Sequence, residues 1–172
     1  MLDEATAPQP ANDYAVSKLA MEHMARLWAH RLPITIVRPF NYTGLGQSPQ
    51  FLIPKIVAHA KQRAPVIELG NLDVDRDFSD VRDVAAAYVR LLQQTPADPS
   101  FNMKTKNTHS MREVIERVEA ISGHHMDVRV NPEFVRANEV RTLRADTGAL
   151  EHAIGEWRSH SLDDTLRWML QG

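Results

Sequence analysis

Residues 12–39 read NDYAVSKLAMEHMARLWAHRLPITIVRP, and this stretch decides the fold class. Asn12 or Asp13 can cap a helix that runs to about Arg31. The β-branched segment 33–39 follows directly between two prolines and predicts a short buried strand. A helix followed so closely by a strand is typical of α/β folds, in which helices cover a largely parallel sheet.

The rest of the chain continues to alternate helical and strand patterns. Residues 40–50 predict a polar loop, and residues 76–79 a short extended stretch. Asp83 follows Asp80 by three residues, as in a capping box, and Gly123 marks the end of a helix. We expect helices over about 51–63, 80–93, 110–122, 146–153 and 162–170, and strands over 66–69, 101–103 and 127–130.

Composition narrows the classes of function. The chain has 172 residues, 43% of them apolar, with a formal net charge of −2. It can therefore form a core, and its charge argues against nonspecific binding of nucleic acid. The absence of cysteine excludes disulfides and thiolate metal sites. No apolar run approaches the ~20 residues that span a bilayer, and the first residues lack a signal-peptide pattern, so we expect a cytoplasmic protein without a membrane partner.

Tyr14 and Lys18 are four residues apart and project from one face of the predicted helix. A phenol has an ordinary pKa of about 10, and a nearby ammonium group lowers that pKa by favouring the phenolate. A phenol tuned in this way can pass a proton to a carbonyl oxygen. The pair predicts carbonyl/alcohol redox chemistry, although by itself it also fits an ordinary helix start with an exposed tyrosine and a solvated lysine.

Four segments together resemble the extended short-chain dehydrogenase/reductases, the NAD-dependent epimerase/dehydratase family. Their order and spacing follow the family pattern over nearly the whole chain. The segments are ANDYAVSK at 11–18, VRPFNYTGLGQ at 37–47, DRDFSDVRDVA at 75–85 and FVRANE at 134–139.

The resemblance implies the C-terminal part of a Rossmann-like parallel sheet with flanking helices, plus a small mixed α/β substrate-binding subdomain. Residues 1–48 would end the Rossmann-like domain and carry the active-site helix. Residues 49–172 would form mainly the substrate-binding subdomain, with strands and helices that return to the sheet. The family's Gly-rich dinucleotide turn and its upstream catalytic Ser/Thr have no counterpart here, so we expect the cofactor-binding N-terminal half to be absent. A truncated gene product, a split subunit and an expressed fragment all stay open.

The resemblance also assigns roles near the cofactor, which would be NAD or NADP. Tyr14 would protonate a keto oxygen as hydride arrives. Lys18 would lower the pKa of Tyr14 and hydrogen-bond the nicotinamide ribose. Pro39 and Phe40 would close over the nicotinamide, or would simply end a strand with a packed aromatic ring.

Five further residues are implied for the sugar nucleotide. Arg76 and Arg136 would clamp the diphosphate, since guanidinium groups make paired charge-assisted bonds to anionic oxygens. Asn41 would bind the diphosphate or the sugar, Glu139 the ribose hydroxyls, and Lys55 the substrate side. Each could instead be an ordinary turn or surface residue.

Metal binding is not expected. The spacing of Asp77, Asp80 and Asp83 matches capping and ion pairing better than metal ligation, and the chemistry needs no metal.

The loop at 40–47 resembles that of the family's GDP-4-keto-6-deoxyhexose reductases, although Tyr42 stands where these usually have histidine. We therefore expect NAD(P)H-dependent reduction of a GDP-linked 4-keto-6-deoxyhexose. The alternatives are a GDP-mannose 4,6-dehydratase or an epimerase of the same family, or a noncatalytic sugar-nucleotide-binding or interaction module. A homodimer through the Tyr–Lys helix, or association with the missing half, is also expected. The choice between NAD and NADP, and the stereochemistry of the sugar, are not predicted.

Overall fold

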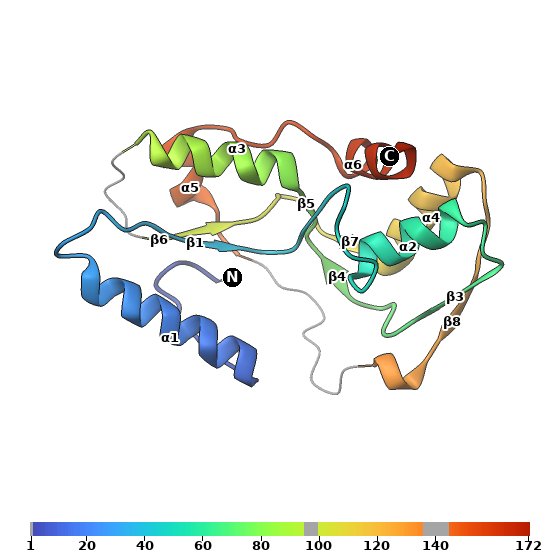
Figure 1. Cartoon of the computed structure of the whole chain (residues 1–172), viewed down its shortest axis with the longest axis horizontal. Helices are drawn as coiled ribbons and strands as arrows, with labels where there is room; N and C mark the ends of the chain where they lie inside the picture. The colour runs from blue at the N-terminus through green and yellow to red at the C-terminus, as the bar shows by residue number, and fades with distance from the viewer. Residues whose placement is uncertain (1, 95–99, 136–144) are drawn as a thin grey trace.

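The structure is a computed structural model that describes residues 2–94, 100–135 and 145–172 (Figure 1). Short strands alternate with helices along the chain, as the sequence predicts. The helices are α1 (Asp13–Trp28), α2 (Leu52–Lys61), α3 (Val81–Leu92), α4 (Met111–Ser122), α5 (Gly148–Ile154) and α6 (Leu162–Gln171), with a 3₁₀ turn, η1 (Pro132–Phe134). The strands are β1 (Ile36–Pro39), β2 (Tyr42–Thr43), β3 (Val66–Leu69), β4 (Asp75–Arg76), β5 (Ser79–Asp80), β6 (Ser100–Met103), β7 (His109–Ser110) and β8 (Asp127–Val130).

The strands associate in four pairs. Three pairs are parallel, namely β1 with β6, β2 with β5, and β3 with β8, whereas β4 and β7 are antiparallel. Parallel strands need crossover connections, and helices supply them here. This arrangement confirms the predicted α/β fold. It places two short strands, β2 and β5, where the sequence pattern predicts only loop and an extended stretch.

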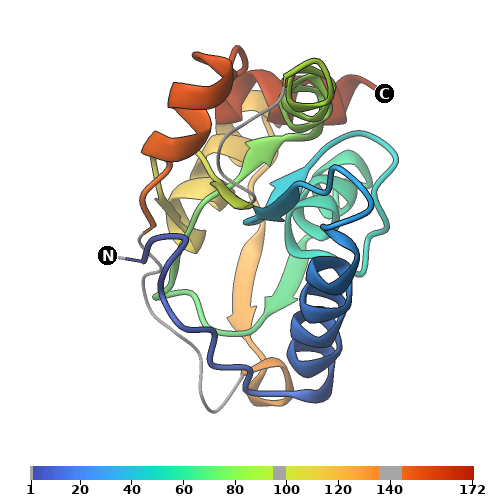
Figure 2. The same cartoon turned by 90° about the vertical axis from the view of Figure 1, so that its left-hand side faces the viewer.

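Two hydrophobic clusters hold the elements together. The larger is formed by α2, β3, α4 and α6, and the smaller by α3, β6, α5 and the buried Trp157. Figures 1 and 2 show α3 and α5 on one side of the β1–β6 pair and α1 on the other. Strand β6 is fully buried, whereas every residue of β1 is only half-buried. The division at residue 48 stays a prediction.

Helix α1 is attached to the sheet mainly by one ion pair. Arg38 on β1 donates from Nε to Glu22 Oε1 at 2.8 Å and from a terminal nitrogen to Oε2 at 2.7 Å. Helix α1 contains no buried residue. Its exposed apolar side chains include Met21, Met24 and Leu27.

Local signals set most helix ends. The Asn12 side chain accepts from the Ala15 amide at the start of α1, and Gly123, with a φ of 62°, ends α4 in the left-handed region. The predicted capping box at Asp83 is wrong. Asp80 alone caps α3, by accepting from the Arg82 amide.

The Asp83 carboxylate turns instead to the segment that leads into α6. Asp83 accepts from the amide and hydroxyl of Ser159 and from the amide of His160, at 2.6–3.0 Å. Hydrogen bonds to the ionised form lower the pKa of Asp83 against the opposing effect of burial. Since its partners lie some 76 residues away, the local pattern gave no sign of them.

Candidate active site and sugar-nucleotide site

Tyr14 and Lys18 lie one turn apart on the open side of α1. The Lys18 ammonium nitrogen is 5.3 Å from the centre of the Tyr14 ring. The Tyr14 side chain is 72% exposed, so it is free to approach a second molecule. The geometry thus places a cation over the ring of an accessible phenol.

Pro39, Phe40 and Asn41 follow one another at the carboxyl end of β1. Phe40 donates its amide to the Met103 carbonyl at the end of β6, at 2.8 Å. Pro39 and Phe40 are half-buried and Asn41 is exposed. Ligands of open α/β sheets bind outside the carboxyl ends of the strands, and these three residues occupy that edge.

Arg76 is half-buried on β4 and lies opposite His109 of β7. Its guanidinium donates to the neighbouring Asp75 carbonyl at 2.9 Å. Three residues later, the Ser79 amide donates to the Asn41 carbonyl at 2.9 Å. The segment that carries Arg76 is therefore bonded directly to the loop that carries Asn41.

Lys55 is held by the protein. Its ammonium donates to the Glu68 carbonyl at 2.6 Å and lies 4.6 Å from the centre of the Phe134 ring. Gly70 lets η1 approach β3, because a Cβ there would lie 2.4 Å from the Phe134 carbonyl oxygen. The structure thus brings Lys55 close to the segment that precedes Arg136. Arg136 and Glu139 themselves lie outside the described residues.

Asp77 has an environment that the sequence pattern does not predict. It neither caps a helix nor forms an ion pair among the described residues. Its carboxylate is 2% exposed and accepts from the Thr105 amide at 2.7 Å and from the Thr105 hydroxyl. Its other oxygen, Oδ2, has no hydrogen-bond partner there. Burial is the largest effect and raises the pKa of Asp77 to about 6.

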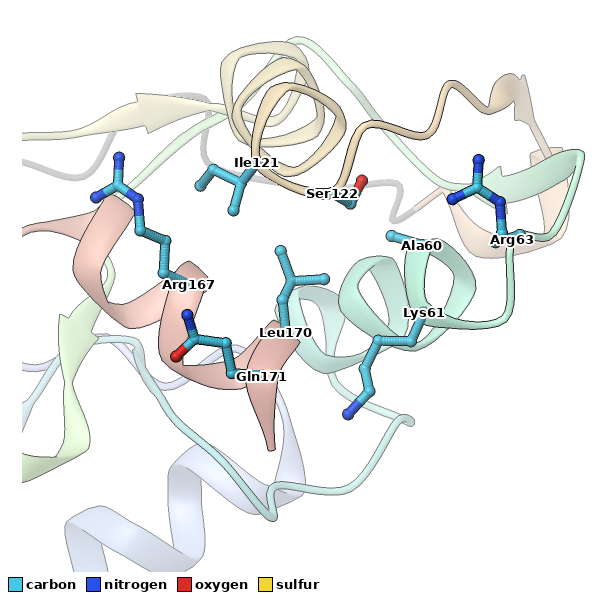
Figure 3. Close-up of a pocket in the computed structure, with 8 residues that line it drawn as sticks. All are labelled: Ala60, Lys61, Arg63, Ile121, Ser122, Arg167, Leu170 and Gln171. Carbon is cyan, nitrogen blue, oxygen red and sulfur yellow. The ribbon is translucent and has the colours of Figure 1, made fainter.

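A pocket of about 440 Å³ lies at the other end of the α2–α4–α6 cluster from Lys55 (Figure 3). Ile121 and Leu170 face each other across it, whereas Lys61, Arg63 and Arg167 point away from one another. None of the predicted site residues that the structure describes lines it. Within the described part of the chain, no His, Asp and Glu side chains gather as a metal site, and no helix is long and apolar enough to cross a membrane.

The comparison with protein families decides the assignment. A family profile described as GDP-mannose 4,6 dehydratase matches residues 1–169. The chain belongs to the GDP-mannose 4,6-dehydratase family. This confirms the resemblance to NAD-dependent epimerases and dehydratases, on which the predicted site residues rest.

Two curated relatives of this family act on GDP-linked deoxyhexoses by name. The chain is 36% identical to GDP-6-deoxy-D-talose 4-dehydrogenase of Aggregatibacter actinomycetemcomitans, over 90% of the chain and 53% of that protein. It is 34% identical to GDP-6-deoxy-D-mannose reductase of Pseudomonas aeruginosa, over 98% of the chain and 58% of that protein. The chain thus spans little more than half the length of these relatives.

The chain also spans little more than half the length of the solved structures that it matches. A protein from Burkholderia cenocepacia J2315, provisionally described as an epimerase, is 56% identical with a TM-score of 0.94, over 99% of this chain and 56% of that one. The RMD protein of Pseudomonas aeruginosa, complexed with NADPH, is 34% identical with a TM-score of 0.89, over 98% of this chain and 58% of that one. The fold is therefore that of about half of such a family member.

Proposed function

We propose that this chain supplies the proton-donating and sugar-binding part of an NAD(P)H-dependent reductase of a GDP-linked 4-keto-6-deoxyhexose. A complementary N-terminal half would supply most of the cofactor site. The isolated chain is expected to be inactive. The observation that carries the proposal is the exposed Tyr14 phenol beside the Lys18 ammonium, on a chain related to two GDP-deoxyhexose enzymes.

The residues of this chain fit a nicotinamide cofactor on chemical grounds. Tyr14 and Lys18 are exposed side by side, and Pro39 and Phe40 lie at the strand edge where such ligands bind. The bound cofactor would supply hydride to the sugar's keto carbon. Tyr14 would donate its phenolic proton to the keto oxygen, so that the alkoxide charge never develops fully. Lys18 would stabilise the phenolate that remains and bind the nicotinamide ribose.

The sugar nucleotide would lie between two groups of side chains. Arg76 and Arg136 would bind the diphosphate, and Asn41 the diphosphate or sugar. Lys55 and Glu139 would bind the nucleoside part, in keeping with the position of Lys55 beside the segment that leads to Arg136. Two guanidinium groups suit a diphosphate because each can make paired, charge-assisted hydrogen bonds.

Calorimetric titration of the purified chain tests the binding site. GDP and GDP-mannose are expected to bind and UDP-glucose to bind more weakly. Arg76→Ala and Arg136→Ala should each reduce GDP affinity by at least about tenfold, or ~1.4 kcal/mol. Arg129→Ala is the matched control, because Arg129 is an exposed arginine on β8 that pairs with Asp127. Equal losses in all three variants would contradict a specific diphosphate site.

Tyr14→Phe tests the chemistry. The chain would be co-expressed with the N-terminal half of the Pseudomonas aeruginosa reductase, and oxidation of NADPH by the 4-keto sugar would be followed. The variant should lose at least about 100-fold in kcat, the lower end of what a general acid contributes, while GDP affinity is kept. Tyr88→Phe, which removes another partly exposed phenol, is the control. Near-normal turnover by Tyr14→Phe would refute its role.

An epimerase or dehydratase of the same family is the second candidate. It is favoured by the 56% identity to the Burkholderia protein and by the description of the family profile. The co-expressed enzyme separates the candidates, because a reductase consumes NADPH stoichiometrically whereas an epimerase or a dehydratase regenerates its cofactor.

A further inference from the structure

Asp77 is linked to two residues that the proposed function places on the substrate, Arg76 and Asn41. It directly follows Arg76 and is two residues before Ser79, whose amide donates to the Asn41 carbonyl. Strands β4 and β5 on either side of Asp77 are only two residues long each. Such short pairings supply few hydrogen bonds, so the path of this segment depends on additional contacts.

The Asp77 carboxylate supplies such a contact from outside the segment. Its Oδ1 accepts from the Thr105 amide at 2.7 Å and lies within hydrogen-bond distance of the Thr105 hydroxyl, whose single proton can go to Oδ1 or to the Asn107 carbonyl at 2.8 Å. The buried Lys104 ammonium donates to the Thr105 carbonyl at 2.5 Å. The turn after β6 is thus bonded to Asp77, and β7 at the end of this turn pairs with the strand that carries Arg76.

We propose that Asp77 is a positioning residue for the sugar-nucleotide site, and that its buried carboxylate holds the β6–β7 turn against the β4–β5 segment and so fixes Arg76 and Asn41 relative to each other. The identity of the ligand in this inference rests on the proposed function, whereas the contacts of Asp77 are observed in the structure. Asp77 is too buried to touch a ligand itself, so it acts through its neighbours.

Oδ2 of Asp77 has no hydrogen-bond partner in the described part of the chain, which supports a role beyond ordinary packing. A buried carboxylate oxygen without a donor is costly, and buried polar groups normally find partners. Burial is the largest effect on the pKa of Asp77 and raises it, whereas the nearby Lys104 and His109 of β7 act in the opposite direction. A proton on Oδ2 removes the buried charge and leaves Oδ1 free to accept from Thr105.

The experiment compares two variants at Asp77 with one at Asp83. Asp77→Ala removes the acceptor, whereas Asp77→Asn keeps an oxygen that can accept from Thr105. Asp83→Ala is the matched control, because Asp83 is another buried carboxylate with several donors, but it binds Ser159 and His160 instead. Each protein is titrated with GDP at a temperature where circular dichroism shows it to be folded.

Asp77→Ala should weaken GDP binding at least fivefold, Asp77→Asn by about twofold or less, and Asp83→Ala by about twofold or less. Between pH 5 and 8, the wild-type affinity for GDP-mannose, whose diphosphate does not titrate in this range, should change with a midpoint near pH 6 that Asp77→Asn lacks. Unchanged binding by Asp77→Ala, or an equal loss in Asp83→Ala, would overturn the inference.

Amide hydrogen exchange provides a readout that needs no ligand. Asp77→Ala should speed exchange at Thr105 and also at Ser79, where the amide bonds to Asn41. Asp77→Asn should largely restore protection. If Ser79 keeps wild-type protection in Asp77→Ala, the positioning role is refuted. If the wild type binds no GDP, the proposed binding by this chain fails, and the exchange result still decides the role of Asp77.

Discussion

Helices α1 and α2 belong to the same chain but are buried very differently. In α2, which has ten residues, Ile53, Ile56, Val57 and Ala60 are all buried. In α1, which has sixteen, no residue is buried. Helix α2 packs against α4 and α6, whereas α1 is joined to β1 by the Glu22–Arg38 ion pair. The difference teaches that α2 is stabilised by packing within the described residues, whereas α1 leaves apolar side chains such as Met24 and Leu27 exposed, which predicts self-association through this face.

The largest contrast should come from truncating one side chain in each helix. Ile56→Ala empties a fully buried position in α2 and should lower the free energy of unfolding by about 2–5 kcal/mol. Met24→Ala shortens a side chain of α1 that is 64% exposed and should change the free energy of unfolding by less than ~0.5 kcal/mol. Urea unfolding measures both. A substantial loss in Met24→Ala would show that α1 is buried in solution, for example by self-association.

Asp77 should contribute to the free energy of unfolding at low pH and lose this contribution as the pH rises. Its pKa is raised from 3.8 to about 6, so this contribution is fully present below pH 3.8 and is lost as the pH rises through 6. The linked free energy is about 3 kcal/mol. Unfolding free energies of wild type and Asp77→Asn should therefore diverge between pH 4 and 7, with the wild type losing more.

Asp164→Asn is a control for this pH series, because the contribution of Asp164 to stability has the opposite pH dependence. The Ser161 hydroxyl lowers the pKa of the Asp164 carboxyl, so its contribution is lost as the pH falls. A difference between wild type and Asp77→Asn that stays constant from pH 4 to 7 would contradict the raised pKa.

A smaller effect is expected at the ion pair that attaches α1. Glu22→Gln leaves Arg38 without its anionic partner and should cost about 1–2 kcal/mol. Arg38 lowers the pKa of Glu22, so this contribution is present above pH 4.5 and is lost as the pH falls through the pKa of the folded state. Amide exchange should increase in α1 and stay unchanged in α2. Equal increases in both helices would show that the two unfold together.

The smallest effect on stability should come from charging the exposed face of α1. Met24→Glu with Leu27→Glu should leave the unfolding free energy within ~0.5 kcal/mol of wild type. It should nevertheless reduce self-association in sedimentation at micromolar concentration, because the apolar surface is removed. Leu92→Glu, at an 86% exposed position on α3, is the control. A wild type that is cleanly monomeric would contradict the predicted association.

Features with a local physical cause could be predicted from the sequence. Asn12, Gly123 and Ser161 act on backbone groups within a few residues, and each is found at the predicted helix end. Tyr14 and Lys18 share a helix face because of the fixed period of the helix. Strands β3 and β8 match their predicted ranges for a similar reason, because alternating side chains and flanking turn residues are also local features of the sequence.

Features created by distant contacts could not be predicted. Asp83 caps nothing because Ser159 and His160 attract it from far along the chain. The pKa of Asp77 depends on burial by the assembled fold, and its neighbour Thr105 is 28 residues away. Lys55 could be placed near a ligand by resemblance, but not beside Phe134, a contact that requires the close approach at Gly70.

The strand pairings also govern how the chain reaches its fold. Ile36 lies opposite Ser100, and Val66 lies opposite Asp127. Neither parallel pair can close until its two strands, at least sixty residues apart along the chain, have been brought together, and closing such a loop costs entropy before any contact forms. We therefore expect slow refolding. During synthesis on the ribosome, Ile36 must wait for β6 to emerge, and that interval is when the chain is most exposed to aggregation.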